Sequence, residues 1–87
     1  MARNEELIIK ILLQAETASS EAPIQNIRVE GFDEAIVFEY IRILIDSDRF
    51  IAGETIPLLN GQRNSLIRNI TLLGEDFLMN AKNTNKN

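Results

Sequence analysis

Two pairs of acidic residues have the type and spacing that chemistry at a site would need: Asp46 with Asp48, and Glu75 with Asp76. Closely spaced carboxylates can act as a general acid and base, or hold a metal ion. The sequence has no histidine and no cysteine to complete either kind of site. We therefore interpret both pairs as solvated charges at helix ends, and expect no catalytic residue, no metal and no cofactor.

The serines and the Asn-Gly turn offer no reactive site either. Ser19, Ser20 and Ser65 have no histidine that could serve as their base. Asn60-Gly61 is not followed by the Lys-Ser/Thr pair of a phosphate-binding loop, and is instead typical of a hairpin turn. The sequence predicts a protein that is not an enzyme.

Residues 60–69 form a basic stretch without acidic side chains. Arginines and side-chain amides on such a hairpin commonly contact the DNA backbone or the minor groove. The predicted DNA contacts in this stretch are Gln62, Arg63, Asn64 and Arg68.

Composition limits the remaining classes of function. The chain has 87 residues, of which 45% are hydrophobic and 25% charged, as expected for one globular domain. No segment approaches the ~20 apolar residues of a membrane helix, so we expect no membrane contact and a cytoplasmic location. The formal net charge of −4 opposes nucleic-acid binding over the whole surface and leaves only a local basic patch.

Hydrophobic periodicity predicts three helices that would position these side chains. The first covers residues 5–18 with Asn4 as its cap, the second covers 35–47 with Asp33 as its cap, and the third covers 72–82 with Thr71 as its cap. We expect one domain over residues 1–82, followed by a disordered polar tail over residues 83–87.

Alternating and β-branched segments predict the strands. Residues 24–30 form one strand, with Ile27 and Val29 on the same face, and residues 50–57 and 66–70 form a hairpin. Asp48 is expected in the left-handed conformation that ends the second helix. The fold class is α+β, in the order helix, strand, helix, hairpin, helix.

Gly74 stands one turn into the closing helix, where glycine costs about 1 kcal/mol relative to alanine. We interpret it as a point where the helix lies against a neighbouring backbone, since glycine has no Cβ. Leu73, Phe77 and Leu78 are expected to supply a large share of the core.

The second helix is apolar over most of its circumference, with one narrow polar stripe of Glu39, Arg42 and Asp46. Two alternatives remain open for its other side chains. Either the flanking helices bury them all, or some are left for another chain, which favours a homodimer. The residues concerned are Ile36, Phe38, Tyr40 and Ile43.

The order of elements resembles a winged helix-turn-helix domain whose second helix is shortened or lost. The segments "NEELIIKILLQAE", "VEGFDEAIVFEYIRILIDSDRFIAGE" and "IRNITLLGEDFL" are similar to a family of small bacterial and phage proteins of unknown function, which close with a Leu-Thr-x-x-Gly-x-x-Phe-Leu helix. The chain departs from that family at Asp48-Arg49, where glycine and an apolar residue are common, and at Tyr40, where histidine is common.

Two functions follow from this resemblance and from the charge. The first is a dimeric DNA-binding, transcription-regulatory protein that contacts double-stranded DNA through the hairpin and reads guanine through Arg42. The second is an acidic protein–protein interaction module, such as a phage adaptor or inhibitor, that does not bind DNA. Fold analogy favours the first function and charge favours the second.

Overall fold

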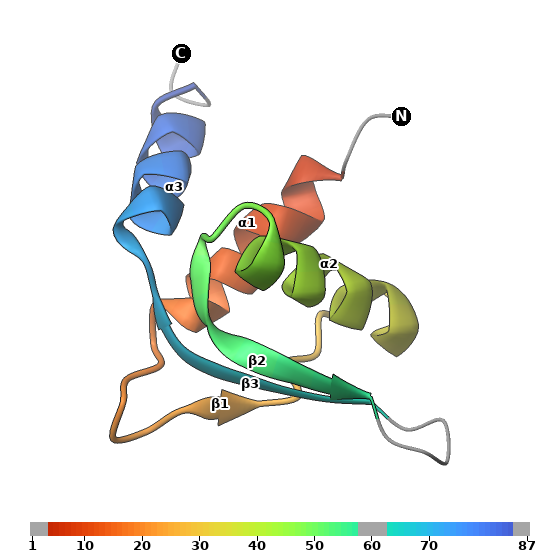
Figure 1. The fold of residues 1–87 in the computed structure, drawn as a ribbon. Helices are drawn as coiled ribbons and strands as arrows, with labels where there is room; N and C mark the ends of the chain where they lie inside the picture. Colours follow the sequence, from red (N-terminus) through yellow and green to blue (C-terminus); the bar gives the residue numbers. More distant parts are fainter. Residues whose placement is uncertain (1–3, 58–62, 85–87) are drawn as a thin grey trace.

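The computed structural model describes residues 4–57 and 63–84, which form three helices and three strands (Figure 1). The α+β class predicted from the sequence is confirmed. Within these two ranges, no helix has both the length and the apolar character that crossing a membrane requires. In chain order the elements are α1 (Glu5–Ala15), β1 (Ile24–Gln25), α2 (Glu34–Asp46), β2 (Ile51–Pro57), β3 (Arg63–Ile70) and α3 (Leu72–Thr84).

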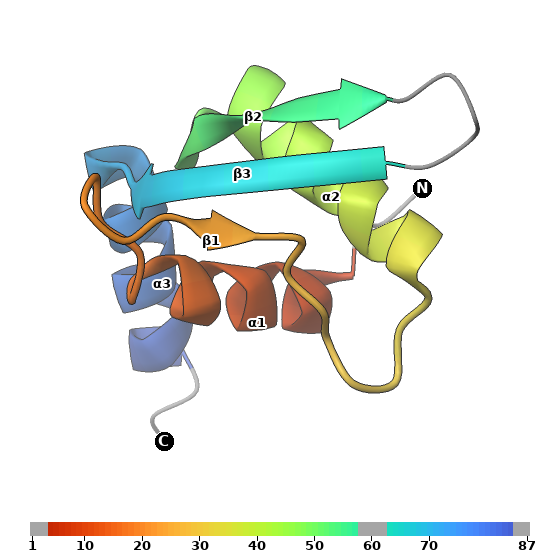
Figure 2. The ribbon, with the colours of Figure 1, turned by 90° about the horizontal axis from the view of Figure 1, so that it is seen from below.

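The three strands form an antiparallel sheet in the order β1-β3-β2. The hairpin pairs Ile51 with Ile70 at one end and Pro57 with Arg63 at the other. Helices α1 and α2 cover one face of this sheet, and α3 lies at the end of the sheet away from Pro57 and Arg63 (Figures 1 and 2). The core therefore lies between the sheet and the two covering helices.

Helix α1 supplies the largest group of core side chains. The side chain of its cap, Asn4, accepts a hydrogen bond from the Leu7 N–H at 3.1 Å, as predicted. The helix ends at Ala15, short of the predicted residue 18, because both the backbone N–H and the hydroxyl of Thr17 donate to the Gln14 carbonyl. The buried core comprises Leu7, Ile8, Ile11, Leu12, Ala15, Ala18, Ile27, Val29, Val37, Ile41, Leu44, Ile51, Ile67 and Leu78.

Strand β1 is much shorter than the predicted strand over residues 24–30. Asn26 has a positive φ of 54°, which turns the chain away from β3 after two paired residues. The backbone N–H of Asn26 donates to the Ser65 carbonyl at 3.0 Å, and its side-chain oxygen accepts from the Ser65 N–H at 2.8 Å. Ile27 and Val29 are nevertheless both buried, so the alternating pattern identified their common face correctly.

The turn after α2 differs from the prediction by one residue. Arg49, with a φ of 59°, adopts the left-handed conformation that was expected of Asp48. The next residue, Phe50, donates its N–H to the Leu44 carbonyl at 2.8 Å, which satisfies the end of the helix. Arg49 thus occupies the position where glycine is usual at helix ends. At the other end, Asp33 is at the N-cap position, but its side chain makes no capping hydrogen bond.

Thr71 joins this turn to α3. Its hydroxyl donates to the Arg49 carbonyl at 2.6 Å and accepts from the Gly74 N–H at 3.2 Å, and its own N–H donates to the Phe50 carbonyl at 2.9 Å. A Cβ on Gly74 would collide with that same Phe50 carbonyl oxygen. The predicted cap and the predicted reason for the glycine are both confirmed.

The packing of α3 corrects one core assignment. Leu78 is buried, and the ring of Phe77 lies 5.1 Å from that of Phe50, but the side chain of Leu73 is 56% exposed. Gly74 and Leu78 are four residues apart and take the inner face, so Leu73 is turned outward.

Candidate functional site

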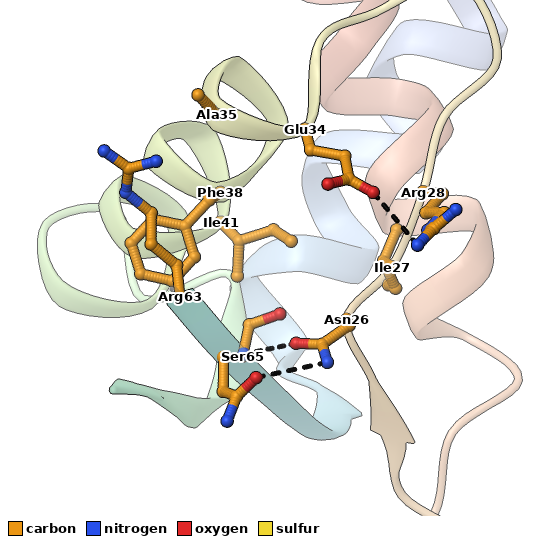
Figure 3. Close-up of a pocket in the computed structure, with 10 residues that line it drawn as sticks. Asn26, Ile27, Arg28, Glu34, Ala35, Phe38, Ile41, Arg63 and Ser65 are labelled. Carbon is orange, nitrogen blue, oxygen red and sulfur yellow. Dashed lines mark hydrogen bonds and ion pairs between the residues drawn. The ribbon is translucent and has the colours of Figure 1, made fainter. Parts of the chain in front are cut away.

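A cleft of about 460 Å³ opens between the first half of α2 and the neighbouring ends of β1 and β3 (Figure 3). The cleft exists because the chain turns away from β3 at Asn26, directly after β1 ends at Gln25. The part of β3 near Arg63 is therefore not covered by β1. Ten residues line the cleft: Asn26, Ile27, Arg28, Glu34, Ala35, Phe38, Ile41, Arg63, Asn64 and Ser65.

Ser65 lies at the base of this cleft, beside Asn26 (Figure 3). Ser65 is only 4% exposed. Within the described part of the chain, it is the one polar residue that is buried. Its backbone is paired with Asn26 on one side of the strand. Its side chain faces α2, as do the side chains of Arg63 and Ile67, which lie two residues away on either side along β3. No described residue makes a hydrogen bond to the Ser65 hydroxyl, and that oxygen is not among the fully buried atoms that lack a partner, so it keeps access to the cleft.

Two arginines stand on opposite sides of the cleft (Figure 3). The Arg63 guanidinium lies over the ring of Phe38, 5.9 Å from its centroid, which is within the range of a cation–π contact. Across the cleft, Arg28 is paired with Glu34 at 3.0 Å. Between them lie the apolar side chains of Ile27 and Ile41.

The residues predicted to contact DNA are not gathered on one surface. Arg63 lines the cleft, while Arg68 is paired with Glu54 at 3.2 Å on the sheet face opposite the helices. Asn64 also lines the cleft, and its side-chain oxygen accepts a hydrogen bond from Asn26 at 3.3 Å. Gln62 lies outside the described residues.

Arg42 lies on the exposed side of α2, where it is paired with Glu39 at 2.9 Å. The hydrogen bond to Glu39, together with the charge of that carboxylate, raises the pKa of the Arg42 guanidinium above its usual value. The donor expected to read guanine is thus already bound to a carboxylate on its own helix.

The predicted partner surface on α2 divides into two parts. At 100° per residue, Ile36, Tyr40 and Ile43 fall on one side of the helix, and Phe38 falls on the side of the cleft. Ile36 is 47% exposed, so the flanking helices do not bury it. Tyr40 is partly committed within the chain, since its hydroxyl accepts a hydrogen bond from the Asn4 N–H at 3.0 Å.

The sequence did not single out Asn26, Arg28 or Ser65 as site residues. Their proximity depends on the left-handed turn at Asn26, and only the tolerance of asparagine for that conformation hints at it. Over residues 4–57 and 63–84, no group of three or more histidine, cysteine, aspartate or glutamate side chains is arranged to hold a metal ion.

Residues 2–86 match the model of a protein family described as "Hypothetical protein (DUF2513)". This match includes every helix and strand and all ten residues of the cleft. No curated protein and no solved structure matches the chain significantly.

Proposed function

We propose that this chain, which belongs to the DUF2513 family, is a non-enzymatic protein-binding module with a winged-helix-like fold. The sheet order β1-β3-β2, with a helix before β1 and a hairpin after α2, supports this fold, in which α2 stands where a winged helix has two helices. A cytoplasmic location is part of the same proposal.

The binding surface in this proposal is the α2 outer face, defined as Ile36, Glu39, Arg42, Ile43 and Asp46. Glu39, Arg42 and Asp46 are exposed, and the charge of Arg42 is balanced by Glu39, so the face is negative overall. The exposed Ile36 and half-buried Ile43 provide apolar area beside these charges. Such a face suits a partner with basic side chains around an apolar centre.

One observation favours this proposal over DNA binding. Lys10, Arg28, Arg42 and Arg68 each lie within 3.2 Å of a carboxylate oxygen, so their charges are already compensated. A duplex would have to replace these pairs while approaching a chain of net charge −4.

The proposal is tested by comparing proteins captured from host-cell extract by the wild type, by Ile36→Ser and by Glu39→Lys. A genuine partner should be basic and should be lost with both variants. Leu73→Ser is the matched control, because it removes an apolar side chain of similar exposure from α3 and should leave capture unchanged. Identical capture by wild type and the two α2 variants would contradict the proposal.

DNA-binding transcription regulation is the second candidate function, and it is favoured by the surroundings of Arg63. This arginine has no carboxylate within ion-pair distance among the described residues, and it begins the strand that leaves the hairpin tip. In a mobility-shift series over salt, Arg63→Ala with Arg68→Ala should flatten the slope by up to about two units.

In the same series, Arg42→Ala should reduce discrimination between sites by about 1–3 kcal/mol. A charge-matched protein serves as the control. If the wild type shifts no duplex even at low salt, DNA is excluded as a general ligand and the protein-binding proposal stands alone.

A further inference from the structure

We propose that the cleft between α2 and β3 binds a small organic oxyanion: a carboxylate or phosphate ester carried on an apolar body. This site is separate from the α2 outer face, because Phe38 and Ile36 project from different sides of α2. The proposal therefore does not depend on the protein-binding function.

Ser65 gives the first reason. Ser65 is almost fully buried as a residue, but its hydroxyl oxygen keeps access to the cleft and receives no hydrogen bond from the described residues. Such a hydroxyl can donate a hydrogen bond to a ligand atom in the cleft. The backbone of Ser65 is held by two hydrogen bonds to Asn26, so the hydroxyl is presented from a fixed position.

The arginines give the charge of the ligand. The charged residues of the lining are two arginines, Arg28 and Arg63, and one carboxylate, Glu34. Their sum is a net charge of +1 in the cleft. Glu34 already neutralises Arg28, whereas Arg63 is held against Phe38 and keeps its N–H groups for a ligand. An arginine guanidinium can bind a carboxylate or phosphate through two parallel hydrogen bonds.

The apolar lining residues and the volume of the cleft indicate which kind of group the oxyanion is attached to. Ile27, Phe38 and Ile41 supply an apolar part of a lining that is otherwise mostly polar. The volume of about 460 Å³ lies within the range common for small-molecule sites. Glu34 in the wall disfavours a polyanion such as a nucleic-acid strand, which would bring a second negative charge next to it.

The test is an NMR titration of isotope-labelled protein with benzoate, phenyl phosphate and benzamide at constant ionic strength. Benzamide has the shape of benzoate without its charge. We expect saturable shifts of the Arg63 Nε–H and of the amides around Ser65 with one or both anions, and binding at least about tenfold weaker for benzamide. Benzoate and phenyl phosphate together show which oxyanion the cleft prefers.

Variants then assign the binding to the cleft. Arg63→Gln and Ser65→Ala should each weaken binding of the preferred anion by about tenfold. Arg63 is exposed, so its variant keeps the fold even if the other does not. Arg49→Gln removes a positive charge outside the cleft and should leave the affinity unchanged.

Three results would overturn the proposal. The first is shifts by the anions that rise linearly without saturation. The second is an equal loss of affinity in Arg49→Gln and Arg63→Gln. The third is a DNA duplex that moves the Arg63 signal when neither small anion does, which would assign the cleft to backbone phosphates instead.

Discussion

Two hydroxyls of this chain should differ in their contribution to stability. Thr71 makes hydrogen bonds to Arg49 and Gly74, whereas the Ser65 hydroxyl makes none with the described residues. We expect Ser65→Ala to change the free energy of unfolding by less than about 0.5 kcal/mol, because no hydrogen bond is lost. Thr71→Ala should cost about 1–2 kcal/mol through loss of the cap. Urea denaturation measures both, and a large loss with Ser65→Ala would mean that the hydroxyl already has a partner.

Arg49 is a residue whose backbone should prefer glycine. A non-glycine residue in the left-handed conformation costs about 1–2 kcal/mol, and Arg49 has a φ of 59°. Allowing for the greater freedom of glycine in the unfolded chain, we expect Arg49→Gly to stabilise the protein by about 0.5–1 kcal/mol. Ser47→Gly is the control, since Ser47 is right-handed and the change should destabilise. A lower melting temperature for Arg49→Gly would contradict this account.

The capping hydrogen bonds of Asn4 and Thr71 were predictable from the sequence, and the residues of the cleft were not. Asn4 and Thr71 bond to groups three residues away, so local sequence determines them. Ser65 acquires its position through Asn26, 39 residues away in the chain. Pairing over such a distance is set by the fold as a whole, and no spacing rule reports it.

At the scale of elements, Gly74 determines how closely α3 approaches the end of α2. In an open helix, replacing glycine by alanine would stabilise by up to about 1 kcal/mol. Here the added Cβ would meet the Phe50 carbonyl, so Gly74→Ala should destabilise by about 1–3 kcal/mol. Asn83→Ala, exposed on the same helix, should be neutral or slightly stabilising. The sign of the Gly74→Ala effect in thermal unfolding decides the question.

The two leucines of α3 should differ sharply in their contribution to the core. Leu78 is 1% exposed and Leu73 is 56% exposed. Truncation of a buried leucine to alanine costs about 2–5 kcal/mol, so Leu78→Ala should unfold much of the protein at moderate temperature. Leu73→Ala should cost less than about 1 kcal/mol. Equal losses would mean that the outer side of α3 is covered in solution.

Helix periodicity identified all three helices, but it could not decide which apolar face is covered. Leu73 and Phe38 look equivalent to core residues in the sequence, and one is exposed while the other lines the cleft. Likewise, the arginines expected on one DNA-binding surface lie on different faces. Their positions depend on how α2 and the hairpin are oriented, which composition and spacing leave open.

At the scale of the whole molecule, the α2 outer face bears on self-association. The sequence predicts a homodimer through this helix, and that prediction remains to be tested. Two copies meeting here would bring Glu39 and Asp46 of each chain together, with Arg42 already paired. We therefore expect light scattering at micromolar concentration and low salt to give the 9.9 kDa mass of one chain. A doubled mass that returns to one chain with Ile36→Ser would mean that a second copy occupies the face instead of a basic partner.

The early end of β1 has a consequence for solubility. An exposed sheet edge can add strands from other molecules and so start aggregation. Here one edge strand has only two residues, Ile24 and Gln25, before the backbone of Asn26 turns away. The opposite edge, β2, has a bulge between Ala52 and Gly53 and ends at a proline, which cannot donate a hydrogen bond. The turn that opens the cleft therefore also leaves β1 too short to offer a long row of free peptide groups at its edge.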